Sequence, residues 1–68
     1  MPPDFDLSEP ELMVLRYASR GLTTGETAVA VGRSIETVRS HRKHARWKLD
    51  ARTTTQAVAE AIRRYLIP

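Results

Sequence analysis

The chain has 68 residues, a formal net charge of +3 and no cysteine, so it has room for one small domain that no disulfide or thiolate metal site stabilises. No apolar run approaches the length of a membrane span, and the acidic N-terminus lacks the apolar segment of a signal peptide, so we expect a cytoplasmic protein. Residues 1–15 carry four acids and no base, whereas residues 16–48 carry eight bases and two acids. This uneven charge indicates a polyanionic partner.

The first helix is expected over about residues 8–20. Ser8 and Glu11 have the spacing of a capping box at its start, and Gly21 is able to take the positive φ that ends a helix. An apolar stripe at i, i+4 spacing marks the face toward the core. It consists of Val14, Leu15, Ala18 and Leu22.

A second, shorter helix is expected over residues 24–31. Thr23 and Glu26 repeat the capping-box spacing, and Gly32 supplies another residue able to take positive φ. The turn that follows, "VGRS", leaves only a few residues before the next helix begins. Such a tight turn between two helices is typical of a helix-turn-helix motif.

The third helix is expected over residues 35–49, with Ser34 as its N-cap. One face is apolar and turns toward the core through Val38, Ala45 and Leu49. At about 100° per residue, the opposite face carries polar residues and one tryptophan. These are Glu36, Arg39, Ser40, Lys43 and Trp47, while Arg42 and Arg46 flank one side and Lys48 the other.

The fourth helix is expected over residues 54–66, capped by Thr53 or Thr54. Its apolar side consists of Ala57, Val58, Ala61, Ile62, Tyr65 and Leu66. One edge should remain for a second subunit, since a symmetric dimer is common for such proteins; the expected dimer contacts are Val58, Ala59, Ile62 and Arg63. No segment alternates in period two, so the fold class is all-α, with a domain over 7–67 after a short acidic tail over 1–6.

This arrangement predicts sequence-specific binding to double-stranded DNA, with the third helix in the major groove. Arg39 is suited to bind guanine bidentately, Lys43 to reach its acceptors and Ser40 to bond to several bases. The flanking residues Arg42, Arg46 and Lys48 lie where phosphates would run, and such contacts position the protein rather than specify sequence.

The order of the pieces "LSEPELMVL", "RGLTTGETA", "ETVRSHRKHARWKL" and "TTQAVAEAIRRYLI" resembles the DNA-binding domain of LuxR/GerE-type transcription regulators. The likeness runs from Leu7 to Ile67 without a gap. It implies a four-helix fold, transcription regulation, and a dimer formed through the last helix. By the same resemblance, Arg39, Ser40 and Lys43 occupy base-contacting positions. Positions that usually face the DNA backbone are occupied by Thr24, Thr37, Arg42, Arg46 and Lys48.

Some positions depart from the family pattern. Arg33 and Thr27 stand where apolar residues are usual, and Ala45 replaces a larger aliphatic residue, which predicts a thinner and less stable core. A second group is apolar where the family is mostly charged, and it consists of Leu12, Met13 and Val29. These three residues either form a patch for a partner or are ordinary exposed apolar residues.

Trp47 and the two histidines have competing interpretations. The Trp47 ring has three candidate roles: contact with DNA, a protein interface, or packing back over Ala51 at the start of the fourth helix. A metal site is not expected at His41 or His44, because no cysteine and no convergent acidic cluster is near. A packed, hydrogen-bonded His41 and an exposed His44 are the simpler expectation.

If Met1 is the native start, the protein is a stand-alone domain regulated by expression, a partner or dimerisation. The alternative function is contact with RNA polymerase or a sigma factor through the Leu12 and Met13 surface, in the manner of sigma region 4. An enzyme is not expected and neither is a cofactor, since the sequence offers no nucleophile–base pair, no paired carboxylates and no Gly-rich phosphate loop.

Overall fold

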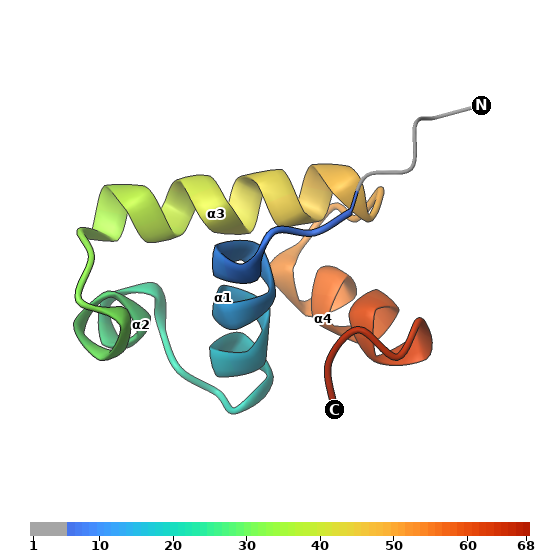
Figure 1. The fold of residues 1–68 in the computed structure, drawn as a ribbon, viewed down its shortest axis with the longest axis horizontal. Coiled ribbons are helices and arrows are strands. Elements are labelled where there is room, and N and C mark those ends of the chain that lie inside the picture. Colours follow the sequence, from blue (N-terminus) through green and yellow to red (C-terminus); the bar gives the residue numbers. More distant parts are fainter. Residues whose placement is uncertain (1–5) are drawn as a thin grey trace.

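The computed structural model describes residues 6–68, which form four α-helices and no strand. They are α1 (Glu9–Ser19), α2 (Thr24–Val31), α3 (Ile35–Lys48) and α4 (Thr54–Arg63). Helix α3 lies lengthwise over the others, with α1 against its middle, α2 below its N-terminal end and α4 near its C-terminal end (Figure 1). The all-α prediction is confirmed, and no helix in this part of the chain is long and apolar enough to cross a membrane. The expected acidic tail lies outside the described residues except for Asp6.

Each helix begins at the cap that local sequence predicts. Ser8 and Glu11 form a complete capping box on α1, and Thr23 and Glu26 form one on α2. In the second box the Thr23 N–H donates to Glu26 Oε1 at 2.8 Å, and these hydrogen bonds hold the pKa of Glu26 below its usual value. Hydroxyl caps also start α3, at Ser34, and α4, where Thr53 and not Thr54 is the N-cap. Each cap hydroxyl thereby satisfies one of the donors that a helix start leaves unpaired, the third N–H of the helix, and the donors before it stay available.

All four helices end in the same hydrogen-bonding pattern, the Schellman motif. At the end of α4 the Leu66 N–H donates to the Ala61 carbonyl at 2.9 Å, and the Tyr65 N–H donates to the Ile62 carbonyl at 3.0 Å. This motif requires a left-handed residue after the helix. Within residues 6–68, positive φ occurs at Gly21, Gly32, Asp50 and Tyr65. Two of the four ends therefore place a residue with a Cβ in a conformation that favours glycine.

The predicted extent of the fourth helix, 54–66, was wrong at its C-terminal end, because α4 stops at Arg63. The left-handed turn at Tyr65 (φ 59°) reverses the chain and brings Ile67 into the core. Tyr65 is consequently 94% exposed and Leu66 is also exposed, although both were expected on the apolar side of the helix. Burial of Ile67 replaces the burial that a longer helix would have given these two residues.

Helix α1 joins two small apolar clusters through adjacent residues. Leu15 packs with residues of α3 and α4 and of the C-terminus, namely Ala45, Leu49, Ala57, Ala61 and Ile67. Val14 packs on the other side with Ala28 of α2 and Val38 of α3. The core contains many alanines, which lets helices approach closely but buries little apolar area per residue.

Two of the three departures from the family pattern lie in this core. Ala45 and Thr27 are fully buried, and the Thr27 hydroxyl donates to the Thr23 carbonyl at 2.8 Å, which satisfies its polar atom inside α2. Arg33 is exposed in the turn after α2, so it does not enter the core. The expected thinning of the core therefore has a structural basis at Thr27 and Ala45 only.

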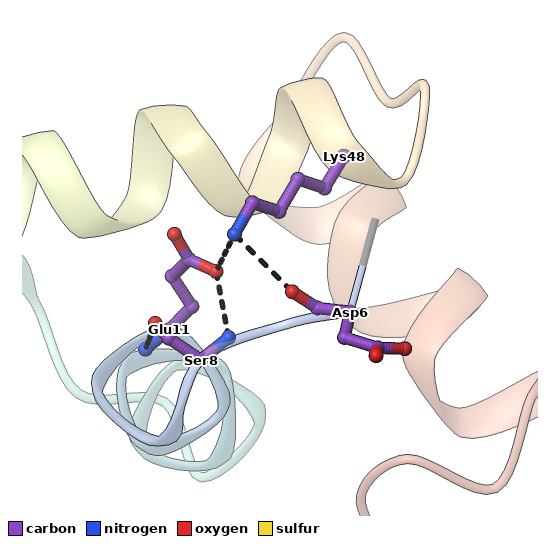
Figure 2. Close-up of polar contacts among 4 residues, drawn as sticks. All are labelled: Asp6, Ser8, Glu11 and Lys48. Carbon is purple, nitrogen blue, oxygen red and sulfur yellow. Dashed lines mark hydrogen bonds and ion pairs between the residues drawn. The ribbon is translucent and has the colours of Figure 1, made fainter. Parts of the chain in front are cut away.

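The start of α1 is joined to the end of α3 by one carboxylate. Glu11 Oε1 accepts a hydrogen bond from the Ser8 N–H at 2.9 Å and from the Lys48 ammonium at 2.8 Å. Lys48 also donates to the backbone carbonyl of Asp6 at 3.2 Å, while the Asp6 carboxylate points away (Figure 2). Burial of Glu11 by itself raises its pKa, but the hydrogen bonds from Lys48 and Ser8 outweigh burial, so the pKa of Glu11 lies below its usual value of 4.5.

Acid should weaken the fold through Glu11. Folding lowers the pKa of Glu11. The stabilisation is therefore complete at pH values above the pKa of Glu11 in the unfolded chain, and it is lost as pH falls through the pKa of Glu11 in the folded protein. We expect Glu11→Gln to lower the free energy of unfolding at pH 7 by about 1–3 kcal/mol and to flatten its decline between about pH 5 and about pH 3. Chemical denaturation at several pH values measures both effects, and an unchanged acid slope in the variant would contradict this account.

A glycine at position 65 should stabilise the protein. The left-handed conformation costs a residue with a Cβ about 1 kcal/mol, and the exposed Tyr65 ring gains little in return. We expect Tyr65→Gly to raise the free energy of unfolding by somewhat less than that cost, because glycine also gains entropy in the unfolded chain. Tyr65→Ala is the matched control, since it removes the ring and keeps the Cβ. Equal stability of the two variants would show that the backbone conformation is not the cause.

Candidate nucleic-acid interface

Helices α2 and α3 have the arrangement of a helix-turn-helix. Only Gly32, Arg33 and Ser34 separate them, and Gly32 takes the left-handed conformation (φ 67°) that reverses the chain. Ser34 Oγ accepts from the Thr37 N–H at 3.1 Å and starts α3 directly after the turn. Packing between Ala28 and Val38 holds the two helices together. The outer face of α3 is consequently turned away from the core along its length.

An open groove of about 470 Å³ runs along that outer face. Residues from three helices line it, namely Thr24 of α2, Glu36, Arg39, Ser40, Arg42, Lys43 and Arg46 of α3, and Thr54 of α4. The structure thus brings together six of the eight residues that sequence predicted to contact DNA. The first residues of α2 and of α4 both face this groove, and a helix start with free N–H groups favours phosphate.

The three residues expected to contact bases are exposed in the groove. Arg39 forms a long ion pair with Glu36, 3.9 Å between Arg39 Nη1 and Glu36 Oε1, with both side chains mostly in solvent. Ser40 and Lys43 are exposed beside them. An exposed pair of this length contributes little to stability, so the Arg39 guanidinium can change partners at small cost.

Arg42 has a structural role in addition to its place in the groove. Its Nη2 donates to the Leu22 carbonyl at 3.1 Å, which ties the middle of α3 to the loop between α1 and α2. Burial lowers the pKa of Arg42, but a guanidinium remains protonated at neutral pH. Its Nε is buried and has no hydrogen-bond partner among residues 6–68. The sequence interpretation, which placed Arg42 at the DNA backbone only, missed the contact with Leu22 because that carbonyl is 20 residues away in the chain.

Arg46 also lines the groove and, like Arg42, donates to a backbone carbonyl. Its Nη1 donates to the Arg52 carbonyl at 3.4 Å in the loop before α4. The same loop leads to Thr54, the first residue of α4, which lines the groove. Thr54 was expected only as a possible cap, and its place at the groove follows from the path of the loop, which no local pattern reveals.

Two of the predicted DNA-contacting residues do not line the groove. Lys48 is held by Glu11 and Asp6, as described above. The Thr37 hydroxyl lies 2.9 Å from the Ser34 hydroxyl, and Thr37 lines a different depression together with Met13 and His41. Helical periodicity placed Lys48 on the flank of the correct helix, but its partner lies 37 residues earlier in the chain.

The tryptophan, the expected apolar patch and the two histidines do not line the groove. Trp47 is 66% exposed, so most of its surface faces solvent. Leu12 packs against the core, so only Met13 and Val29 of the expected apolar patch are exposed. The histidines are half-buried (His41) and exposed (His44), and no group of three His, Asp or Glu side chains in residues 6–68 is arranged to hold a metal ion.

The residues expected at a dimer interface divide between core and surface. Val58 packs against the core cluster, and Ala59 is half-buried. Ile62 is exposed, and Arg63 forms a 3.2 Å ion pair with Glu60. Together with the nearby Tyr65 and Leu66, Ile62 provides exposed apolar side chains at the C-terminal end of α4.

Comparison with known families relates this geometry to other proteins. Residues 6–61 match the GerE family, described as bacterial regulatory proteins of the luxR family, and the match covers both helices of the helix-turn-helix and the groove. No curated protein matches the chain significantly. The family is a DNA-binding regulator class and not an enzyme class. The chain therefore belongs to the luxR family of bacterial regulatory proteins.

Proposed function

We propose that this protein binds double-stranded DNA sequence-specifically as a transcriptional regulator, with α3 in the major groove. The observation that carries the proposal is the groove itself, which exposed donors of α3 line together with the first residues of α2 and α4. In a helix-turn-helix the second helix of the motif enters the major groove, and its outer residues meet base edges. Since bacterial DNA lies in the cytoplasm, the proposal also places the protein there.

Bases would be contacted by Arg39, Ser40 and Lys43. Arg39 offers a planar pair of donors that matches the two acceptors of guanine, and Lys43 offers a point charge for the same acceptors. Because these side chains are exposed, they need to break few contacts of the folded protein before they bind. This favours their assignment to base edges over a structural assignment.

Phosphates would be contacted by Thr24, Arg42 and Arg46. Thr24 lies in the first turn of α2, where backbone N–H groups point outward, and the two arginines are fixed by the Leu22 and Arg52 carbonyls. A fixed guanidinium loses less entropy on binding than a freely rotating one. Thr37 and Lys48 stay outside this set, because neither lines the groove and their polar groups are bound away from it.

A homodimer through α4 completes the proposal. The exposed Ile62, next to Arg63 and the half-buried Ala59, offers a surface where a second α4 would bury apolar side chains. A two-fold dimer would present two α3 helices to successive major grooves, about one helical turn apart. Paired half-sites in duplexes selected from a random pool would be the signature of that dimer.

The alternative role, contact with RNA polymerase or a sigma factor, has less support. It relied on an apolar surface at Leu12 and Met13, and Leu12 packs against the core. Met13 lines a depression with Val14, Val31 and other residues, but nothing in the structure indicates what would cover it.

DNA binding should weaken steeply with salt, because each phosphate contact releases counterions. Arg46→Ala should weaken binding to all sequences alike and reduce the slope of log K against log salt by about 1. Fluorescence anisotropy on a selected and a scrambled duplex, from low to moderate salt, measures both effects. Helicity and thermal unfolding of the variant must match wild type, since Arg46 also holds the Arg52 carbonyl. Salt-independent binding would refute the proposed function.

Replacement of a base-contacting residue should instead change sequence preference. Arg39→Ala and Lys43→Ala should each weaken binding to the preferred duplex by about 1–3 kcal/mol and relax the base requirement at one position. Selection of bound duplexes from a random pool, for wild type and each variant, gives the requirement position by position. If Arg39→Ala loses the same affinity on preferred and random DNA, Arg39 is a phosphate contact and not a base contact.

A further inference from the structure

We infer that Glu36 also reads sequence, by accepting a hydrogen bond from the exocyclic amine of a cytosine next to the guanine that Arg39 binds. This rests on the proposed function and adds a specificity-determining residue to it. Glu36 is the only acid among the residues that line the groove. It lies in the first turn of α3, and its side chain is 83% exposed.

Electrostatics limits what this carboxylate can contact in a complex with DNA. A phosphate would repel it, and the cost is higher at the protein–DNA surface than in water because the local dielectric is lower. In the major groove only two groups donate hydrogen bonds, cytosine N4 and adenine N6. Glutamate pairs characteristically with cytosine N4, so a carboxylate held at the base edges selects against guanine and thymine.

The spacing of Glu36 and Arg39 suits neighbouring base pairs. They are three residues apart on one face of α3, which separates them by about 4.5 Å along the helix axis. Successive base pairs are stacked about 3.4 Å apart. One acceptor and one forked donor at this spacing are complementary to a cytosine and a guanine in adjacent pairs.

A simpler interpretation is that Glu36 only stabilises the start of α3 and orients Arg39. An acid in the first turn does favour the helix dipole, but the 3.9 Å contact with Arg39 joins two exposed groups. Such a pair leaves the guanidinium free to rotate. The two interpretations predict changes at different base positions, which makes them separable.

The test is selection of bound duplexes from a random pool by wild type, Glu36→Gln and Glu36→Ala. Glu9→Gln is the matched control, because Glu9 is an exposed acid in the first turn of α1, forms a 4.0 Å ion pair with Arg16, and does not line the groove. We expect wild type to prefer cytosine at one position by roughly 5- to 150-fold. Both Glu36 variants should lose that preference, keep the adjacent guanine preference, and bind random DNA more tightly.

Each result decides the matter. If the Glu36 variants lose the guanine preference alone, Glu36 is a positioning residue for Arg39, and the inference is overturned. An unchanged motif in both variants would also overturn the inference. A motif that Glu9→Gln changes equally would also overturn it, since the effect would then follow from charge in general. Failure of wild type to select any sequence would refute the proposed function together with this inference, whereas a selected wild-type motif keeps the two questions distinct. Two different replacements guard against a variant that folds poorly.

Discussion

One oxygen atom, Glu11 Oε1, closes the capping box of α1 and binds the last residue of α3. The two hydrogen bonds depend on each other, because the capping contact with Ser8 holds the Glu11 carboxylate where the Lys48 ammonium can bind it. At the middle of α3 the Arg42–Leu22 hydrogen bond makes a second connection, to the loop after α1. A core built largely from alanine and valine provides limited apolar burial, so these polar connections matter for the angle at which α3 lies on the domain. The groove depends on that angle.

The basic character of α3 is therefore divided between two purposes. Arg39 and Lys43 are left in solvent, while Lys48 is used inside the molecule and Arg42 and Arg46 are used in both ways. A charge whose donors are already bound to the protein's own carbonyls and carboxylate adds to the positive potential but has fewer donors for DNA. For this reason, the number of basic residues on α3 is larger than the number of side chains fully available to contact DNA.

Chain reversal is uniform in this fold. Every helix ends in a Schellman motif, yet glycine occupies the left-handed position at only two of the four ends. Asparagine and aspartate tolerate this conformation better than other residues with a Cβ, which fits Asp50 at the end of α3. Tyr65 has no such tolerance, and the burial of Ile67 beyond it is what maintains the turn.

By itself the sequence determined the helix starts, the two glycine turns, the all-α class and the face of α3 that carries Arg39, Ser40 and Lys43. Each of these follows from residues within about four positions of one another, where capping and helical periodicity act. The partners of Lys48, Arg42 and Arg46, the arrival of Thr54 at the groove, and the end of α4 at Arg63 were decided by the tertiary structure. Lys48 and Arg42 pair with atoms 37 and 20 residues away, and the last helix ends where the left-handed turn at Tyr65 brings Ile67 into the core. Periodicity contains no information about such distant partners, since they meet only when the helices pack.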